Sequence, residues 1–342
     1  MNNVYGLLAT LLFGATTSVM ANVTGLSYQY KDWELVCENT GICRAAAYQR
    51  EDAAAVISVL LTRHAGKNAQ LEAQVQIQLG DRIIPHLNLN LPNLADNTVR
   101  LSNDTQIGQL SAKQTQALLT AVQGKKPIRW TFGDLHWHLS VDGATATLVK
   151  MDEFQHRLNT PTALVKKGQG SSDSVLIAQQ KPEIHWVKPV RGSIQDIKMN
   201  TPQAQKLKTL LLKKTEAEAC ELLKSNQDED AAFRVYPLNA QHKLLEVPCW
   251  RAAYNMASGF AVLNNDLTKI QQWVTSNGSD YELGKISAAH KGRGLGDCWT
   301  QKEWVWNGKQ FFQSYHAVQL QCRGFAGGAW DLPLYQADVV SP

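Results

Sequence analysis

The sequence predicts an α+β fold that is mostly β, with two disulfide-containing domains built from antiparallel sheets and a few short helices. Apolar and polar residues alternate in several separate segments, and this period of two is typical of half-buried strands. Segments with helix signals are few and short. Six cysteines are spread over both halves of the 342-residue chain, whose length suggests about two domains.

The composition is that of a soluble globular protein, with 44% hydrophobic and 19% charged residues. It excludes a disordered chain and a polytopic membrane protein. The formal net charge of +4 is spread over the whole chain and is too small to indicate a nucleic-acid partner. No apolar stretch approaches the roughly 20 residues that a membrane-spanning helix needs, so we expect no transmembrane segment.

Residues 1–21 have the pattern of a cleavable signal peptide. A short apolar run precedes Val19-Met20-Ala21, which fits the small-residue rule before a cleavage site. No Lys or Arg stands ahead of the run, so the α-amino group alone supplies the usual positive charge. A buried N-terminal helix or a single membrane anchor is the alternative. We expect export and a mature chain that starts at residue 22.

The six cysteines all lie in the expected mature chain. An even number of cysteines in an exported protein indicates disulfides, and their spacing favours sequential pairing. The expected bridges are Cys37–Cys43, Cys220–Cys249 and Cys298–Cys322. A zinc site is the alternative, but the sequence has no C-x-x-C pair and no His at ligand spacing from a Cys pair, so we expect no metal.

Residues 22–165 are predicted to form an N-terminal β-rich domain. Three segments alternate between apolar and polar residues, as half-buried strands do. They are residues 71–79, 87–91 and 135–141. Ser111 is a typical helix N-cap and Gly124 a typical stop, so a helix is expected over 112–123.

Residues 166–200 are predicted to be a basic linker, because they begin with a polar stretch rich in Gly and Ser and contain Pro182 and Pro189. Over residues 166–214, ten Lys or Arg stand against three acidic residues. This excess has two interpretations: peripheral contact with an anionic envelope surface, or a solvated linker and helix face.

Residues 201–342 are predicted to form a C-terminal α+β domain. Thr201 followed by Pro202 is the pattern of a helix N-cap with proline at the first helical position. Asn307-Gly308 stands between two apolar-aromatic runs and predicts a β-hairpin. The glycine-rich residues 292–297 lack the strand-turn-helix context of a phosphate loop. We expect them to form a tight turn whose glycines adopt positive φ.

Several motifs together resemble a known family. The most specific are Gly292-Arg-Gly-Leu-Gly-Asp-Cys298 and Cys322-Arg-Gly324, and two more are Trp33-Glu-Leu-Val-Cys37 and Asp152-Glu-Phe-Gln-His-Arg157. With them the mature chain resembles the uncharacterised secreted bacterial family called domain of unknown function 1176. The Trp-x-x-x-Cys opening of the front half is also similar to invasion-associated locus B proteins. The resemblance implies a location in the Gram-negative periplasm and no assigned activity.

Two residue pairs offer possible chemistry. Cys298 with the downstream His316 superficially resembles the thiol–imidazole pair of papain-like proteases, but the flanking residues do not match and Cys322 is available as a disulfide partner. His136 and His138 lie on one strand face and have a spacing that can share a metal ion, although no third ligand is evident. A polar outer face is the simpler interpretation of the histidines.

Tryptophan and arginine gather around the third expected disulfide, and these residue types dominate binding hot spots. We call this set the aromatic–arginine cluster. Its members are Arg293, Asp297, Trp299, Trp304, Trp306, Arg323 and Trp330. Trp304 and Trp306 are expected to share a strand face. The alternative interpretation is that this face forms the core of a small β domain.

The sequence favours an exported binding or interaction module that uses the aromatic–arginine cluster as its surface. We expect no cofactor and no catalytic residue, and the expected partner is another envelope protein or a glycan. A cell-envelope hydrolase acting on glycan or peptide is the alternative, with acids such as Asp297 and Glu303 in a tryptophan-lined cleft. A purely structural envelope protein is the third possibility.

Overall fold

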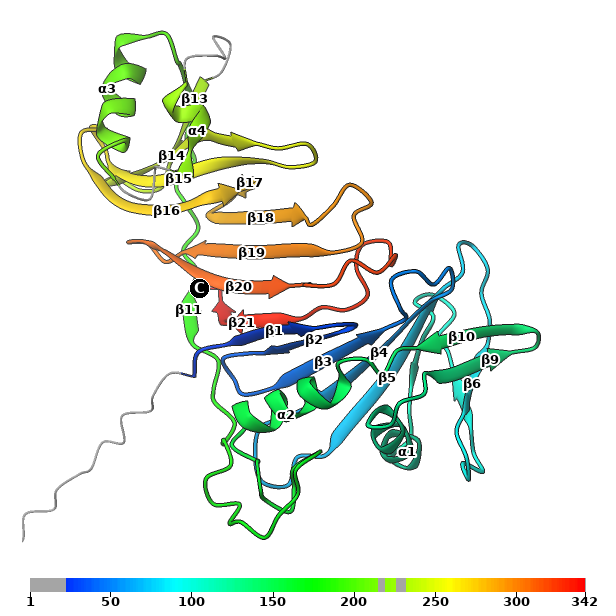
Figure 1. Ribbon diagram of the computed structural model, residues 1–342. Coiled ribbons are helices and arrows are strands. Elements are labelled where there is room, and N and C mark those ends of the chain that lie inside the picture. Colours follow the sequence, from blue (N-terminus) through cyan, green and yellow to red (C-terminus); the bar gives the residue numbers. More distant parts are fainter. Residues whose placement is uncertain (1–22, 215–218, 226–231, 342) are drawn as a thin grey trace, which may run out of the picture.

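The computed structural model describes residues 23–214, 219–225 and 232–341. The expected signal peptide at residues 1–21 lies outside the described residues and stays a prediction. Within the described part, the chain is mostly β, with antiparallel sheets and a few helices, which confirms the predicted fold class (Figure 1). No helix there is long and apolar enough to cross a membrane.

The first part of the chain forms two antiparallel sheets. Sheet I has, in spatial order, β1 (Leu26–Tyr30), β2 (Trp33–Cys37), β3 (Cys43–Tyr48), β4 (Val56–Arg63), β5 (Leu71–Gln78) and β8 (Ile107–Gln109). Sheet II has β10 (Leu135–Leu139), β9 (Ile128–Phe132), β6 (His86–Asn90) and β7 (Thr98–Arg100). Strands β5, β6 and β10 are the three that alternation predicts.

Two helices complete this part: α1 (Ala112–Val122) and α2 (Ala144–Phe154). The predicted cap is confirmed, because the Gln114 N–H donates to the Ser111 hydroxyl and the Ser111 N–H donates to the Gln114 side chain. This reciprocal pair satisfies two N–H groups that a helix start leaves unpaired. One face of sheet I packs against sheet II and both helices to form the largest core.

A buried charged cluster fastens α2 to this core. The Arg63 Nη2 atom lies 2.6 Å from Asp152 Oδ1, and the other Asp152 oxygen accepts from the Leu164 N–H. The Gln155 Oε1 atom accepts from both Arg63 and Arg157. Because Arg63, Asp152, Gln155 and Arg157 are all buried, the polar side chains that these residues contribute belong to the framework, whereas Glu153 and His156 of the same motif are exposed.

The second part of the chain forms two further antiparallel sheets. Sheet III has β12 (Gln195–Lys198), β13 (Ala232–Pro237), β14 (His242–Arg251), β15 (Met256–Asn264) and β16 (Ile270–Gly278). Sheet IV has β17 (Asp280–Glu282), β18 (Lys285–Lys291), β19 (Trp299–Trp306), β20 (Phe311–Val318) and β21 (Pro333–Gln336). The residues 166–200 predicted as a linker contain β12 and also β11 (Glu183–His185), which pairs in parallel with β22 (Asp338–Val340).

Two local predictions for this part are confirmed. Helix α3 (Pro202–Leu211) starts after Thr201, whose side chain accepts from the Ala204 N–H. Strands β19 and β20 form the predicted hairpin, and the Asn307 side chain accepts from two N–H groups of its loop. Sheet III lies between two hydrophobic layers, one shared with α3 and α4 (Glu221–Lys224) and one shared with sheet IV.

The outer face of sheet I is also covered. Val36, Ala46 and Leu60 of this face pack against Phe325, Trp330 and other residues of a segment that we call the clamp, residues 318–334. Strand β21 (red in Figure 1) contacts β2 of sheet I, so the last sheet adjoins the first. Strand β2 is therefore buried on both faces.

The three predicted disulfides are confirmed. They are Cys37–Cys43, Cys220–Cys249 and Cys298–Cys322. All six cysteines are among the described residues and none is free. Cys298 therefore has no thiol that a histidine could activate, and the protease-like interpretation of Cys298 and His316 is wrong.

Candidate functional site

The aromatic–arginine cluster does not form one surface. Five of its members are buried, with exposed fractions below a tenth: Trp306 (0%), Asp297 (2%), Trp330 (6%), Trp304 (9%) and Arg323 (9%). Trp304 and Trp306 do share a strand face, but that face packs against sheet III, as the alternative interpretation expects. Trp299 is half-buried and Arg293 is exposed, so these two members are the most accessible to a ligand.

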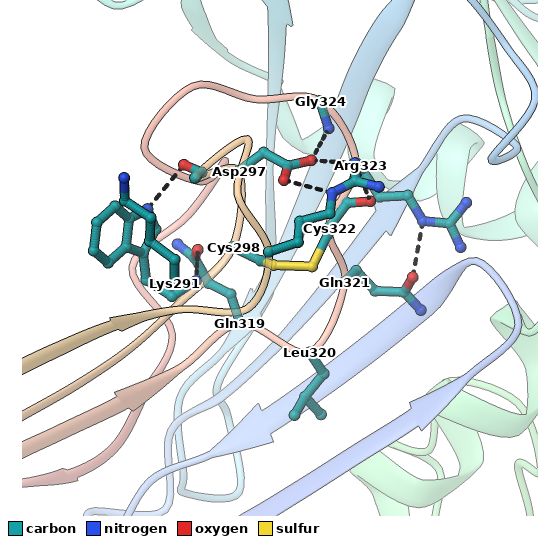
Figure 2. Close-up of a disulfide and its surroundings, with 12 residues drawn as sticks. Lys291, Asp297, Cys298, Gln319, Leu320, Gln321, Cys322, Arg323 and Gly324 are labelled. Atoms are coloured by element: carbon teal, nitrogen blue, oxygen red, sulfur yellow. Dashed lines mark hydrogen bonds and ion pairs between the residues drawn. A yellow bond between two sulfur atoms is a disulfide. The ribbon is translucent and has the colours of Figure 1, made fainter. Parts of the chain in front are cut away.

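Asp297 has a structural role beside the third disulfide. Its carboxylate accepts from Arg293 Nε (2.8 Å) and Nη2 (2.6 Å) and from the Gly324 N–H (2.6 Å). Figure 2 shows Asp297 and Gly324 joined on one side of the Cys298–Cys322 bridge. Hydrogen bonding to Arg293 holds the pKa of Asp297 below its usual range. A carboxylate held ionised in this way is unsuited to act as a general acid.

The glycine-rich turn is built differently from the prediction. Of the three glycines in residues 292–296, only Gly296 has positive φ, at +69°. Gly292 is required for a different reason, because a Cβ there would lie 2.5 Å from the Cys298 sulfur. The expectation of positive φ throughout is wrong, since close approach of the backbone to the disulfide explains the first glycine.

Arg323 connects the clamp to sheet I. Its Nη2 lies 2.9 Å from Asp32 Oδ1, and its Nε donates to Gln321 Oε1 at 2.8 Å (Figure 2). The Gln49 side chain donates to the Arg323 carbonyl oxygen. Nearby, the Trp330 indole N–H donates to the Ser58 hydroxyl at 2.7 Å. Arg323 and Trp330 therefore hold two parts of the chain together.

Glu34 is a buried acid at the same contact. Its carboxylate accepts from the Tyr48 hydroxyl and from the Leu320 N–H, each at 2.5 Å. Burial raises the pKa of Glu34 to about 7, although these hydrogen bonds and Arg323 oppose the shift. Alternation along β2 places the Glu34 side chain on the face of sheet I that points away from the main core, and from the sequence alone this face is expected to be exposed to solvent. Residues of the clamp cover this face and bury Glu34.

An open groove of about 560 Å³ lies on the face of sheet IV that points away from sheet III. Trp299 and Glu303 of β19, Tyr315 of β20, and Trp330 and Asp331 of the clamp contribute to its lining. The Tyr315 hydroxyl donates to Asp331, and burial together with the Asp331 and Glu303 carboxylates raises the Tyr315 pKa well above its usual value. None of the described residues that line the groove is Lys or Arg.

The Trp299 ring is fixed at one end of the groove. Its indole N–H donates to the Gly296 carbonyl oxygen at 2.9 Å, and the Lys291 ammonium lies 5.5 Å from the ring centroid. The groove thus combines aromatic surface, two carboxylates and amide groups such as that of Gln319. This chemistry suits a ligand that carries positive charge or hydrogen-bond donors.

Sequence reasoning finds Trp299, Glu303 and Trp330 but misses Tyr315 and Asp331. The available signal for Tyr315 is its strand register, because it lies directly opposite Glu303 across the predicted hairpin. Asp331 lies in an irregular segment with no periodic pattern, and no local signal indicates that it reaches Tyr315.

A second pocket of about 690 Å³ lies between residues 23–25, residues 178–182 and strands β20 and β21. His316 lines it together with Gln313 and Tyr335. Burial, with a smaller effect of the Lys302 charge, lowers the pKa of His316 to about 4. The imidazole is therefore neutral at physiological pH.

The histidine pair of β10 is exposed at the edge of sheet II. The rings of His136 and His138 lie with their centroids 5.5 Å apart. Among the described residues, the one group of three potential metal-ligating atoms is Asp297, Cys298 and Cys322, whose sulfurs are bonded to each other. The structure thus provides no third ligand for the two histidines within the described chain.

Comparison with known proteins confirms the family resemblance. The family model described as "Protein of unknown function (DUF1176)" matches residues 27–337. The Uncharacterized protein YpfG of Escherichia coli (strain K12) is 26% identical over 330 residues, which cover 88% of this chain and 90% of that protein. Similarity to the crystal structure of invasion associated protein B from Bartonella henselae is weak, with 12% identity and a TM-score of 0.27. It covers 38% of this chain and 99% of that one.

Proposed function

Since the chain belongs to the DUF1176 family of proteins of unknown function, we propose a function from its own geometry: it is an exported periplasmic protein that binds a partner. The binding site is the groove of sheet IV. The three disulfides support export, because disulfides persist in oxidising compartments such as the periplasm.

The composition of the groove carries the proposal. A half-buried Trp299 and a hydrogen-bonded Tyr315 provide rigid aromatic surface, and Glu303 and Asp331 provide exposed carboxylates without a lining cation. Aromatic side chains in a fixed position bind with little loss of conformational entropy. Because the lining charge is negative, the partner is a basic segment of another envelope protein.

The test is cross-linked capture of partners from the bacterial envelope by the tagged mature protein. The variant Glu303→Gln/Asp331→Asn removes both groove charges, and Glu72→Gln/Asp81→Asn is the matched control at exposed positions of the first part of the chain. We expect one dominant protein, captured by the wild type and the control and reduced at least about tenfold for the groove variant. Equal capture by all three proteins contradicts the proposal.

Hydrolysis of glycan or peptide is the competing function. Asp297 does not support it, because this carboxylate is buried and ion-paired away from the groove. The two acidic residues that line the groove, Glu303 and Asp331, are the candidates for such a reaction. If the wild type releases glycan or peptide fragments and Glu303→Gln does not, the function is hydrolysis and not binding.

Export makes a separate prediction about the chain terminus. We expect the mature protein to start at Asn22, because cleavage after Ala21 follows the small-residue rule. N-terminal sequencing and intact mass of the protein from the periplasmic fraction check this. Recovery of an uncleaved chain in the cytosolic fraction contradicts both the signal peptide and the location.

A further inference from the structure

Two neighbouring loops carry the most exposed apolar side chains of the protein. Of the large hydrophobic residues in the described part of the chain, the three most exposed are Leu295 (69%), Met256 (65%) and Tyr254 (64%). Tyr254 and Met256 lie at the turn between β14 and β15, and Leu295 lies in the loop between β18 and β19. Figure 1 shows these two connections at the same end of sheets III and IV.

The two loops are held together rigidly. The Asn255 side chain donates to the Lys291 carbonyl oxygen and accepts from the Lys291 N–H, each at 2.9 Å. The Tyr254 ring lies so close to Gly294 that a Cβ at this glycine would meet it at 2.8 Å. The Cys298–Cys322 bridge anchors the end of the second loop. The apolar side chains are therefore presented by a fixed scaffold, at no further ordering cost to the backbone.

Basic side chains flank this apolar tip. Arg251, Lys291 and Arg293 belong to the same two loops, and Asp297, their one acidic residue, is buried in its ion pair with Arg293. Glu51, from the loop before β4, adds some negative charge near Arg293. The electrostatic attraction to an anionic surface is accordingly modest, and the exposed apolar area is the larger contribution.

We propose that these two loops, residues 251–256 and 291–297, dock the protein on a lipid bilayer that contains anionic lipid. Tyr254, Met256 and Leu295 insert into the boundary between headgroups and acyl chains, while Arg251 and Lys291 approach the lipid phosphates. Apolar side chains on a protruding tip with basic neighbours suit this interface. The proposal concerns a different surface from the groove and does not depend on the proposed function.

The test is co-sedimentation of the oxidised mature protein with vesicles. Vesicles of phosphatidylcholine alone are compared with vesicles that also contain phosphatidylglycerol. We expect the protein to bind both kinds of vesicle through the two loops, and to bind more strongly to the vesicles that contain phosphatidylglycerol. The variant Tyr254→Ser/Leu295→Ser should lower the partition coefficient at least about tenfold, since it removes most of the inserted apolar area.

The matched control is Ile83→Ser/Ile194→Ser, which removes two side chains that are 58% and 56% exposed elsewhere. Its partition coefficient should equal that of the wild type. No sedimentation with phosphatidylglycerol vesicles overturns the proposal, and so does an equal loss in both variants. A loss in Lys166→Ser/Lys167→Ser without one in the loop variant also overturns it and assigns the contact to the basic residues 166–214.

Discussion

Replacing Arg323 with alanine should lower the free energy of unfolding by about 3–5 kcal/mol. The substitution leaves Asp32, which is itself mostly buried, without its cation at the contact between sheet I and the clamp. It also removes the donor to Gln321. Removing one partner of a buried ion pair costs more than the pair contributes, because the remaining charge stays desolvated. Denaturant unfolding of the oxidised mature protein at neutral pH measures the change.

The matched control is Arg50→Ala. Arg50 forms an ion pair with Asp52 in which both side chains are more than two thirds exposed, and such pairs contribute about 0–1 kcal/mol. A loss in Arg323→Ala no larger than that in Arg50→Ala would show that the ion pair does not hold the clamp. It would also reopen a ligand-binding role for Arg323.

Replacing Glu34 with glutamine should stabilise the protein above neutral pH and leave its stability nearly unchanged below about pH 4.5. Burial raises the pKa of Glu34 to about 7 in the folded state from a reference value of 4.5, so the folded chain binds this proton more tightly. The contribution of Glu34 protonation to the free energy of unfolding is therefore fully present below pH 4.5 and is lost as pH rises through 7. The carboxylate is then buried and charged, which costs about 3 kcal/mol.

The quantity to measure is the difference in unfolding free energy between Glu34→Gln and wild type, at steps from pH 4.5 to pH 8. His316 has the opposite linkage, since its lowered pKa of about 4 makes stability rise with pH, but it is present in both proteins and cancels. Glu72→Gln, at an exposed strand position, should show no such trend. A flat difference for Glu34→Gln would mean that the clamp does not desolvate this carboxylate.

Patterns within a few residues predicted much of the local structure. The N-cap at Ser111 and the hairpin at Asn307 appear as expected, because their hydrogen bonds join residues at most three positions apart. The three disulfides also follow the sequential spacing. Strand β16 carries no period-two pattern in its sequence. Its pairing with β15 shifts register several times and only part of one face is buried, so its side chains do not alternate regularly between core and solvent.

The site was predicted less well, because the same residue types serve cores and surfaces. Trp304 and Trp299 lie on one strand and would be equivalent in a hot-spot argument. The two residues are five positions apart, so the alternation of side chains along a strand places them on opposite faces of sheet IV. Trp304 faces sheet III, whereas Trp299 and Glu303 face the groove. Which face of sheet IV is open depends on where sheet III packs, and no local pattern carries that information.

The sequence by itself determined the fold class, the family and the cysteine pairing, since each depends on motifs or on spacing along the chain. Only the tertiary structure decided the roles of Arg323, Trp330 and Glu34. The Trp330 indole meets Ser58 across a separation of 272 residues, and the Leu320 N–H meets Glu34 across 286. Burial and charge at such contacts are properties of two surfaces brought together, so neither surface alone indicates whether its residues bind a ligand or each other.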